Sequence, residues 1–168
     1  FKVGHGARSV GECIALANEN IETKTALMEA RLITGQPKAF EEFRTRFDKE
    51  CMDGREEEFL KLRQVDLSVR HTKQGDTPFV QEPHVKNGCG GLRDYQNLIW
   101  MTYARHRTLN PKDLIGLGLI SKAGWKEVAQ AYDCILRVRN EMHYTEKRAE
   151  DLLTLRLQGP VATNLGYR

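Results

Sequence analysis

The sequence lacks long apolar runs and closely spaced cysteines. Its longest run of large apolar residues is Leu98–Met101, far short of the roughly 20 residues that a bilayer-spanning helix needs, so we expect no membrane segment. The four cysteines, separated by 38, 38 and 45 residues, are Cys13, Cys51, Cys89 and Cys134. Structural zinc sites use close ligand pairs, so this spacing argues against a zinc site. We expect reduced, partly buried thiols in a cytosolic protein.

A strong charge of one sign is also missing. The 168 residues include 26 Lys plus Arg and 23 Asp plus Glu, a net charge of +3, so the sequence does not favour a nucleic-acid partner. An apolar content of 40% is too high for a disordered chain and fits one globular domain, or one domain with a piece of a second. The chain opens at Phe1 with neither an initiator Met nor an apolar signal segment, and we treat it as a fragment of a longer cytoplasmic protein.

Several catalytic motifs are absent. The eight aspartates include no D-x-D pair, and the sequence contains no H-D dipeptide, no H-E-x-x-H and no G-x-S-x-G. Two-metal phosphoryl or nucleotidyl transfer requires carboxylates placed close together. We therefore expect neither a self-contained catalytic site nor a metal site.

Helical signals fill the first part of the chain. Ser9 with Glu12 three residues later forms a capping-box pattern that predicts a helix to about residue 18. Apolar spacing predicts a second helix over 21–33 and, after Pro37, a third. A fourth, opened by acidic residues near 55–58, is expected to continue to about residue 71. Its predicted buried stripe consists of Phe59, Leu62, Val65 and Val69.

The second part adds a long loop and further helices. Glycines and prolines predict an ordered loop over 73–91, and loops of this length are usually functional when ordered. The helices expected beyond it cover 92–107, 111–116, 121–147 and 160–165. The sum is an all-α bundle of about six to eight helices, with a possible short β-strand in residues 1–8.

The loop ends in the most informative segment. Gly88, Gly90 and Gly91 precede a helix start, where free backbone N–H groups can converge, and Lys86 and Arg93 flank them with positive charge. This pattern predicts a cradle for an anion or phosphate. The alternative is a tight turn whose glycines adopt positive φ. The segment matches neither the P-loop nor the dinucleotide-binding fingerprint.

A second signal lies in the longest predicted helix. At helical spacing, Arg139 falls within an apolar face, with His143 beside it; that face comprises Trp125, Val128, Tyr132, Ile135, Leu136 and Met142. A buried arginine needs a partner, because an unpaired buried charge is costly. Asp94 and Glu82 are the leading candidates and Asp151 is the third. Either the ion pair is structural and fixes the helix register, or Arg139 and His143 line a pocket behind the loop.

Several of these segments resemble a known family. Glu82–Lys86 followed by Gly90–Asp94 resembles the signature "EP-x-x-K…GGLRD" of the bacterial protein-PII uridylyltransferase/uridylyl-removing enzymes. Cys89 stands where the family usually has proline, and Leu152 where it usually has arginine. Further similarities follow in the family's order at Gly4-His5 with Arg8, Thr25–Leu32, Arg70-His71, Arg137, Arg139, His143, Glu150-Asp151, Gln158, Val161-Ala162 and Leu165–Tyr167.

The resemblance implies a multidomain nitrogen-signalling enzyme. Its nucleotidyltransferase core would use metal-bound carboxylates, with Mg²⁺, to transfer UMP from UTP to a tyrosine of the trimeric PII protein. Residues 1–8 would end that core, and residues 9–168 would form the helical domain that helps to enclose the nucleotide. The fragment itself would be inactive. The residues implied near the nucleotide are Lys86, Gly90, Gly91 and Arg93, and the supporting residues are Glu82, Asp94, Arg139 and His143.

Two other interpretations stay open. The chain could be a non-catalytic structural module that joins catalytic and hydrolase domains or docks PII. It could also belong to a related nucleotidyltransferase that acts on another substrate.

Overall fold

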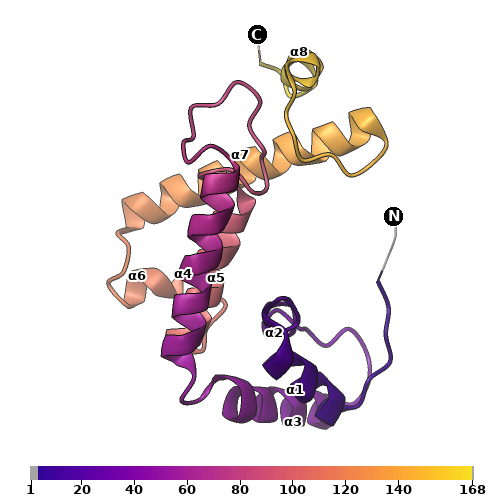
Figure 1. The fold of residues 1–168 in the computed structure, drawn as a ribbon, viewed down its shortest axis with the longest axis vertical. Helices are drawn as coiled ribbons and strands as arrows, with labels where there is room; N and C mark the ends of the chain where they lie inside the picture. The colour runs from indigo at the N-terminus through magenta and orange to yellow at the C-terminus, as the bar shows by residue number, and fades with distance from the viewer. Residues whose placement is uncertain (1–3, 168) are drawn as a thin grey trace.

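The computed structural model describes residues 4–167, which contain eight α-helices and no β-strand. The all-α prediction is confirmed. No regular structure forms in residues 4–8, and Phe1–Val3, the rest of the possible strand, lie outside the described residues. Figure 1 shows the central pair α4 and α5 running side by side, with α1–α3 at one end and α7 and α8 at the other. No helix in the described range is both long and apolar enough to cross a bilayer.

The N-terminal end consists of α1 (Val10–Glu19), α2 (Ile21–Met28), α3 (Pro37–Phe47) and a π-helical turn, η1 (Asp48–Met52). The predicted capping box is confirmed, because Ser9 and Glu12 exchange side-chain to backbone hydrogen bonds of 3.3 and 2.7 Å. Helix α2 ends at Met28, short of the predicted residue 33. Beyond this point Leu32 and Ile33 are exposed, so a further helical turn would have no surface to bury.

Helix α4 (Glu56–Lys73) packs against α5 (Leu92–His106) along a face that the sequence did not predict. Phe59 is buried as expected, but the rest of the predicted stripe was wrong. Its other three residues are exposed: Leu62 by 49%, Val65 by 61% and Val69 by 48%. At about 100° per residue they are rotated away from Phe59 and Arg63, and Val65 is rotated the most. Arg63, only 4% exposed, lies in the interface because its guanidinium stacks on Trp100 of α5, 5.1 Å from the ring centroid.

The C-terminal end contains α6 (Asp113–Gly116), α7 (Lys122–Glu146) and α8 (Leu155–Asn164). Ser121 caps α7 as predicted. Helix α8 starts before the predicted residue 160, because the Glu82 carboxylate, distant in sequence, accepts a hydrogen bond of 2.8 Å from the Leu155 amide.

Two separate clusters of buried apolar residues form the cores of the N-terminal and C-terminal ends. The larger lies among α1–α5, and Trp100 and Tyr103 of α5 close it. The smaller consists of Val85, Met142, Leu157 and Val161. The four cysteines are free thiols, as expected, and range from buried Cys51 to exposed Cys134.

Candidate functional site

The loop between α4 and α5 is fastened to the segment that precedes α8. The Val85 amide donates to the Asp151 carbonyl, and the Leu153 amide donates to the Pro83 carbonyl, each at 2.9 Å. His84 and Leu152 form an isolated antiparallel bridge between these two bonds. Figure 1 shows the loop beside α7 and close to α8. Contacts distant in sequence therefore order the loop.

The amides at the start of α5 are already hydrogen-bonded. The Gly90 amide donates to the Asp94 carboxylate at 2.7 Å. The next three amides donate to backbone carbonyls at 2.9 to 3.0 Å: Gly91 to Gly88, Leu92 to Val85 and Arg93 to Lys86. The prediction of free, converging amides was therefore wrong. The chain folds back over its own helix start, so its carbonyls occupy the place that an anion would take.

The glycines serve this tight turn. Gly90 has a φ of 78°, a conformation that other residues rarely adopt. A Cβ at Gly91 would lie 2.9 Å from the carbonyl oxygens of Val85, Lys86 and Gly88. The structure thus supports the alternative interpretation of a tight turn, with positive φ at Gly90, whereas Gly91 has a φ of -74° and is needed instead for close backbone approach.

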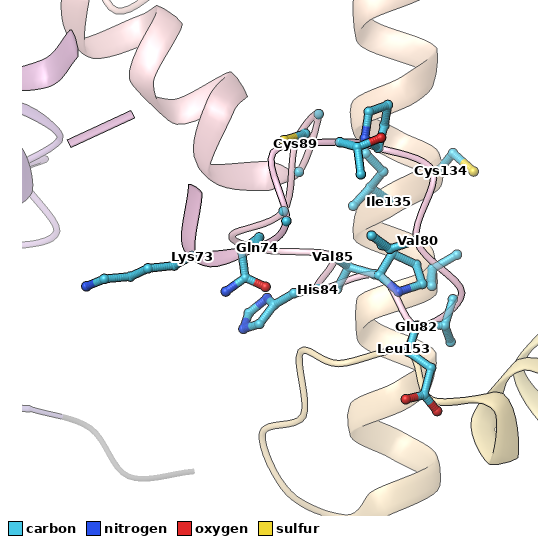
Figure 2. A pocket seen from close by; sticks show the side chains of 18 residues that line it. Lys73, Gln74, Val80, Glu82, His84, Val85, Cys89, Cys134, Ile135 and Leu153 are labelled. Carbon is cyan, nitrogen blue, oxygen red and sulfur yellow. The ribbon is translucent and has the colours of Figure 1, made fainter. Parts of the chain in front are cut away.

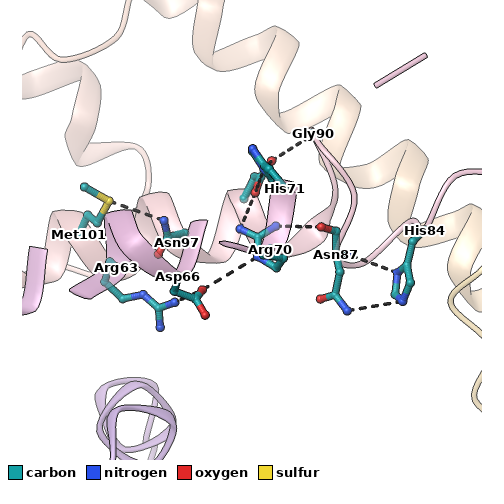
Figure 3. Close-up of polar contacts among 10 residues, drawn as sticks. Arg63, Asp66, Arg70, His71, His84, Asn87, Gly90, Asn97 and Met101 are labelled. Carbon is teal, nitrogen blue, oxygen red and sulfur yellow. Dashed lines mark hydrogen bonds and ion pairs between the residues drawn. The ribbon is translucent and has the colours of Figure 1, made fainter. Parts of the chain in front are cut away.

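Asp94 anchors the loop to the end of α4. Its carboxylate accepts a hydrogen bond of 2.7 Å from Arg70, lies 2.9 Å from His71 Nε2 and also accepts the Gly90 amide. Arg70 donates in addition to the Asn87 carbonyl at 3.0 Å (Figure 3). Asp94 is therefore engaged by α4 and not by Arg139, which corrects the leading expectation for the Arg139 partner.

Asp151 is the actual partner of Arg139, with 2.6 Å between Asp151 Oδ1 and Arg139 Nε. His143 Nε2 lies 3.5 Å from the same oxygen. Burial raises the pKa of the Asp151 carboxyl, but the hydrogen bond and charge of Arg139, the charge of Lys86 and a contribution from His143 outweigh it, so the net pKa is lowered. Glu82, the other leading candidate, is instead the cap of α8.

Lys86 and Arg93 have different surroundings. Their backbones are joined by the Arg93 amide, which donates to the Lys86 carbonyl at 2.9 Å. The Lys86 charge acts on Asp151, whereas the Arg93 guanidinium lies over the Trp100 ring, 5.3 Å from its centroid. Among the described residues, neither side chain forms an ion pair within 4.0 Å.

A pocket of about 540 Å³ opens beside the loop (Figure 2). The end of α4, the loop and α7 surround it, and apolar side chains such as Val80, Ile135 and Leu153 form much of its wall. Of the predicted site residues, Glu82, Gly90 and Gly91 line this pocket, whereas Lys86, Arg93 and Arg139 do not.

Sequence reasoning missed one group of potential ligands. His71, Asp76 and Cys89 each offer a ligand atom, and these atoms lie within 4.8 Å of one another. The spacing of the cysteines carried no sign of this group, because the tertiary fold brings the end of α4 against the glycine turn.

A comparison with known families decides the identity of this arrangement. The family model described as GlnD PII-uridylyltransferase matches residues 58–168. The chain belongs to this family. The resemblance seen in the glycine segment is thereby confirmed, and the GlnD match includes the loop and both carboxylate anchors, Asp94 and Asp151. Helices α1–α3 precede the matched GlnD region. No solved structure matches the chain.

Proposed function

We propose that the chain is the helical, nucleotide-facing segment of a PII uridylyltransferase. Residues 1–8 would end the nucleotidyltransferase core and residues 9–168 would form the helical domain. The parent enzyme, in the cytoplasm, would transfer UMP from UTP to a tyrosine of PII. The family match supports this assignment. The observation that carries the nucleotide-facing role is that Lys86, near the end of the loop, and Arg93, in the first turn of α5, form no ion pair among the described residues.

The charges around Arg93 favour an anionic ligand. Arg63 and Arg93 both lie over the Trp100 ring. Burial lowers the pKa of Arg63, Asp66 opposes this, and the positive charges of Arg93 and Arg70 lower it further. Guanidinium groups bind phosphate through planar, bidentate hydrogen bonds. A nucleotide phosphate near Arg93 would relieve the repulsion between these arginines, and Lys86 would add charge from the adjoining backbone position.

The implied Mg²⁺ does not fit the residues of this chain. Mg²⁺ prefers oxygen ligands in octahedral geometry, whereas the cluster in the described part of the chain contains an imidazole and a thiol. The sequence also has no D-x-D pair. In this proposal the catalytic carboxylates belong to the core of the parent enzyme, and the 168-residue chain alone does not transfer UMP.

Substitution in the full-length parent enzyme tests the nucleotide-facing role. We expect Arg93→Ala and Lys86→Ala to raise the KM for UTP about tenfold, the loss of one charge-assisted contact. Arg156→Ala and Lys126→Ala, at exposed positions, are matched controls and should leave KM unchanged. Wild-type transfer rate and KM in both test variants would contradict the role.

A second candidate function is a structural module, favoured by the two anchored carboxylates. Asp94 and Asp151 tie the loop to α4 and α7 without any ligand. On this alternative, loss of either carboxylate destabilises the domain, and the melting-temperature rise that UTP with Mg²⁺ produces in the parent enzyme is unaffected by Lys86→Ala. A reduced rise in the Lys86→Ala enzyme would instead support the nucleotide-facing role.

A further inference from the structure

We propose that His71, Asp76 and Cys89 form a Zn²⁺ site that fastens the glycine turn to the end of α4. The imidazole, carboxylate and thiol offer ligand atoms within 4.8 Å of one another. Nitrogen, sulfur and oxygen donors of these types are those that zinc uses in proteins. The site is independent of the UTP-facing role proposed above.

The backbone brings Asp76 back toward His71. After α4 ends, the Asp76 amide donates to the His71 carbonyl at 2.9 Å, and Asp76 adopts a left-handed φ of 54°. Its side chain is exposed, so it can move without breaking a packed contact. This turn therefore places a carboxylate beside the histidine through a short, local hydrogen-bonded closure.

Cys89 reaches the same place from the other side of the loop. The Gly90 amide, the next along the chain, donates to Asp94 at 2.7 Å, and Asp94 in turn contacts His71. Cys89 is half-buried and lines the pocket beside the loop (Figure 2). Asp94 thus connects the loop segment that contains Cys89 to helix α4, which contains His71.

The orientation of His71 is typical of a metal ligand. Its Nε2 lies 3.0 and 2.9 Å from the two Asp94 oxygens, so Nδ1 is the nitrogen left for a metal. Histidines that bind metal usually donate their other N–H to a carboxylate, which fixes the tautomer and makes the ligating nitrogen more basic. Arg70 holds Asp94 in place at 2.7 Å.

The donor set selects zinc over the hard cations. Mg²⁺ and Ca²⁺ are bound almost wholly by oxygen, whereas the Cys89 thiolate and His71 imidazole suit Zn²⁺. Tetrahedral zinc would bring the ligand atoms to about 3.5 Å from one another, a small contraction that the exposed Asp76 turn permits. Binding would displace one proton from the Cys89 thiol, and the adjoining pocket gives water access to the fourth position.

Metal titration of the 168-residue chain tests the site. After chelation and removal of the chelator, Co²⁺ and Zn²⁺ are added to the chain and to its variants. We expect one equivalent of Co²⁺ to produce thiolate-to-cobalt charge-transfer absorption that Zn²⁺ abolishes. Cys89→Ser should lose this absorption, and Asp76→Asn should weaken Zn²⁺ binding by about tenfold or more. Cys134→Ser is the thiol control, because Cys134 is exposed on α7 and lines the same pocket but lies outside the ligand group, and it should behave as wild type.

Other results would overturn the assignment. These are absence of stoichiometric Co²⁺ or Zn²⁺ binding in the wild-type chain, unchanged absorption in Cys89→Ser, or loss of absorption in Cys134→Ser. Circular dichroism of each metal-free variant separates ligand loss from unfolding. Zn²⁺ should raise the melting temperature of the wild-type chain and not that of Cys89→Ser; equal rises in both would also contradict the site.

Discussion

The Arg139 guanidinium donates to the Asp151 carboxylate across 2.6 Å, and Lys86 lies near enough for its charge to favour the ionised form of the same carboxyl group. This contact joins α7 to the segment that pairs with the glycine loop. Lys86, predicted near the nucleotide, and Arg139 and His143, predicted as supporting residues, thus converge on one acidic side chain. The carboxylate acts as the organising group between the loop and α7.

Loss of this ion pair should destabilise the domain. Arg139 and Asp151 are 25% and 20% exposed, and Arg139→Ala would leave a largely buried carboxylate without its main partner. We expect a loss of about 2 kcal/mol in the free energy of unfolding, below the value for a fully buried pair because some solvent remains. Urea denaturation measures it. Arg148→Ala removes an arginine that is 68% exposed and should cost less than about 0.5 kcal/mol. Equal effects of the two substitutions would refute this account.

The same pair makes stability depend on pH. The folded-state pKa of Asp151 is lowered, whereas an unfolded aspartate has a pKa of about 3.9. The stabilisation is therefore present above that value and is lost as pH falls through the folded-state pKa. We expect the stability difference between the wild type and Asp151→Asn to be largest near neutral pH and to shrink below about pH 4. Urea titrations at several pH values test this, and a difference that grows on acidification would have the wrong sign.

Gly91 should tolerate no side chain. A Cβ there would meet three carbonyl oxygens at 2.9 Å, so Gly91→Ala requires a backbone shift at the start of α5. We expect destabilisation by more than about 2 kcal/mol. Gly11→Ala is the matched control, because its Cβ would meet nothing within 4 Å inside α1. That variant should be neutral or more stable by about 0.5 kcal/mol. Thermal unfolding of both variants compares them, and a stable Gly91→Ala would show that the turn is not tight.

The two faces of α4 should differ in their response to truncation. Phe59 is 3% exposed, and Phe59→Ala should cost about 3 kcal/mol. Val65 is 61% exposed, and Val65→Ala should change stability by less than about 0.5 kcal/mol. Chemical denaturation of the 168-residue chain provides both values. A large loss at Val65 would mean that the apolar stripe is buried in solution.

Local sequence determined much of the helical structure. Ser9 with Glu12, Pro37 and Ser121 start helices where predicted, because capping and a fixed φ act over a few residues. The glycine segment also indicated the family, because a sequence signature can be recognised without the structure, and the family match confirmed it. The end of α2 was missed because residues 32 and 33 find no surface to pack against. The start of α8 was missed because the Glu82 carboxylate, distant in sequence, accepts a hydrogen bond from the Leu155 amide.

Tertiary structure alone decided the partners of the charges. Periodicity placed an apolar stripe on α4 but could not show that Arg63 would fill the interface by stacking on Trp100. It required Arg139 to have a partner but could not choose Asp151 over Asp94, because that choice depends on how the loop and the α7–α8 connection meet. Local propensity acts through neighbouring residues, whereas ion pairs and ligand clusters depend on distances between elements that only the folded chain sets.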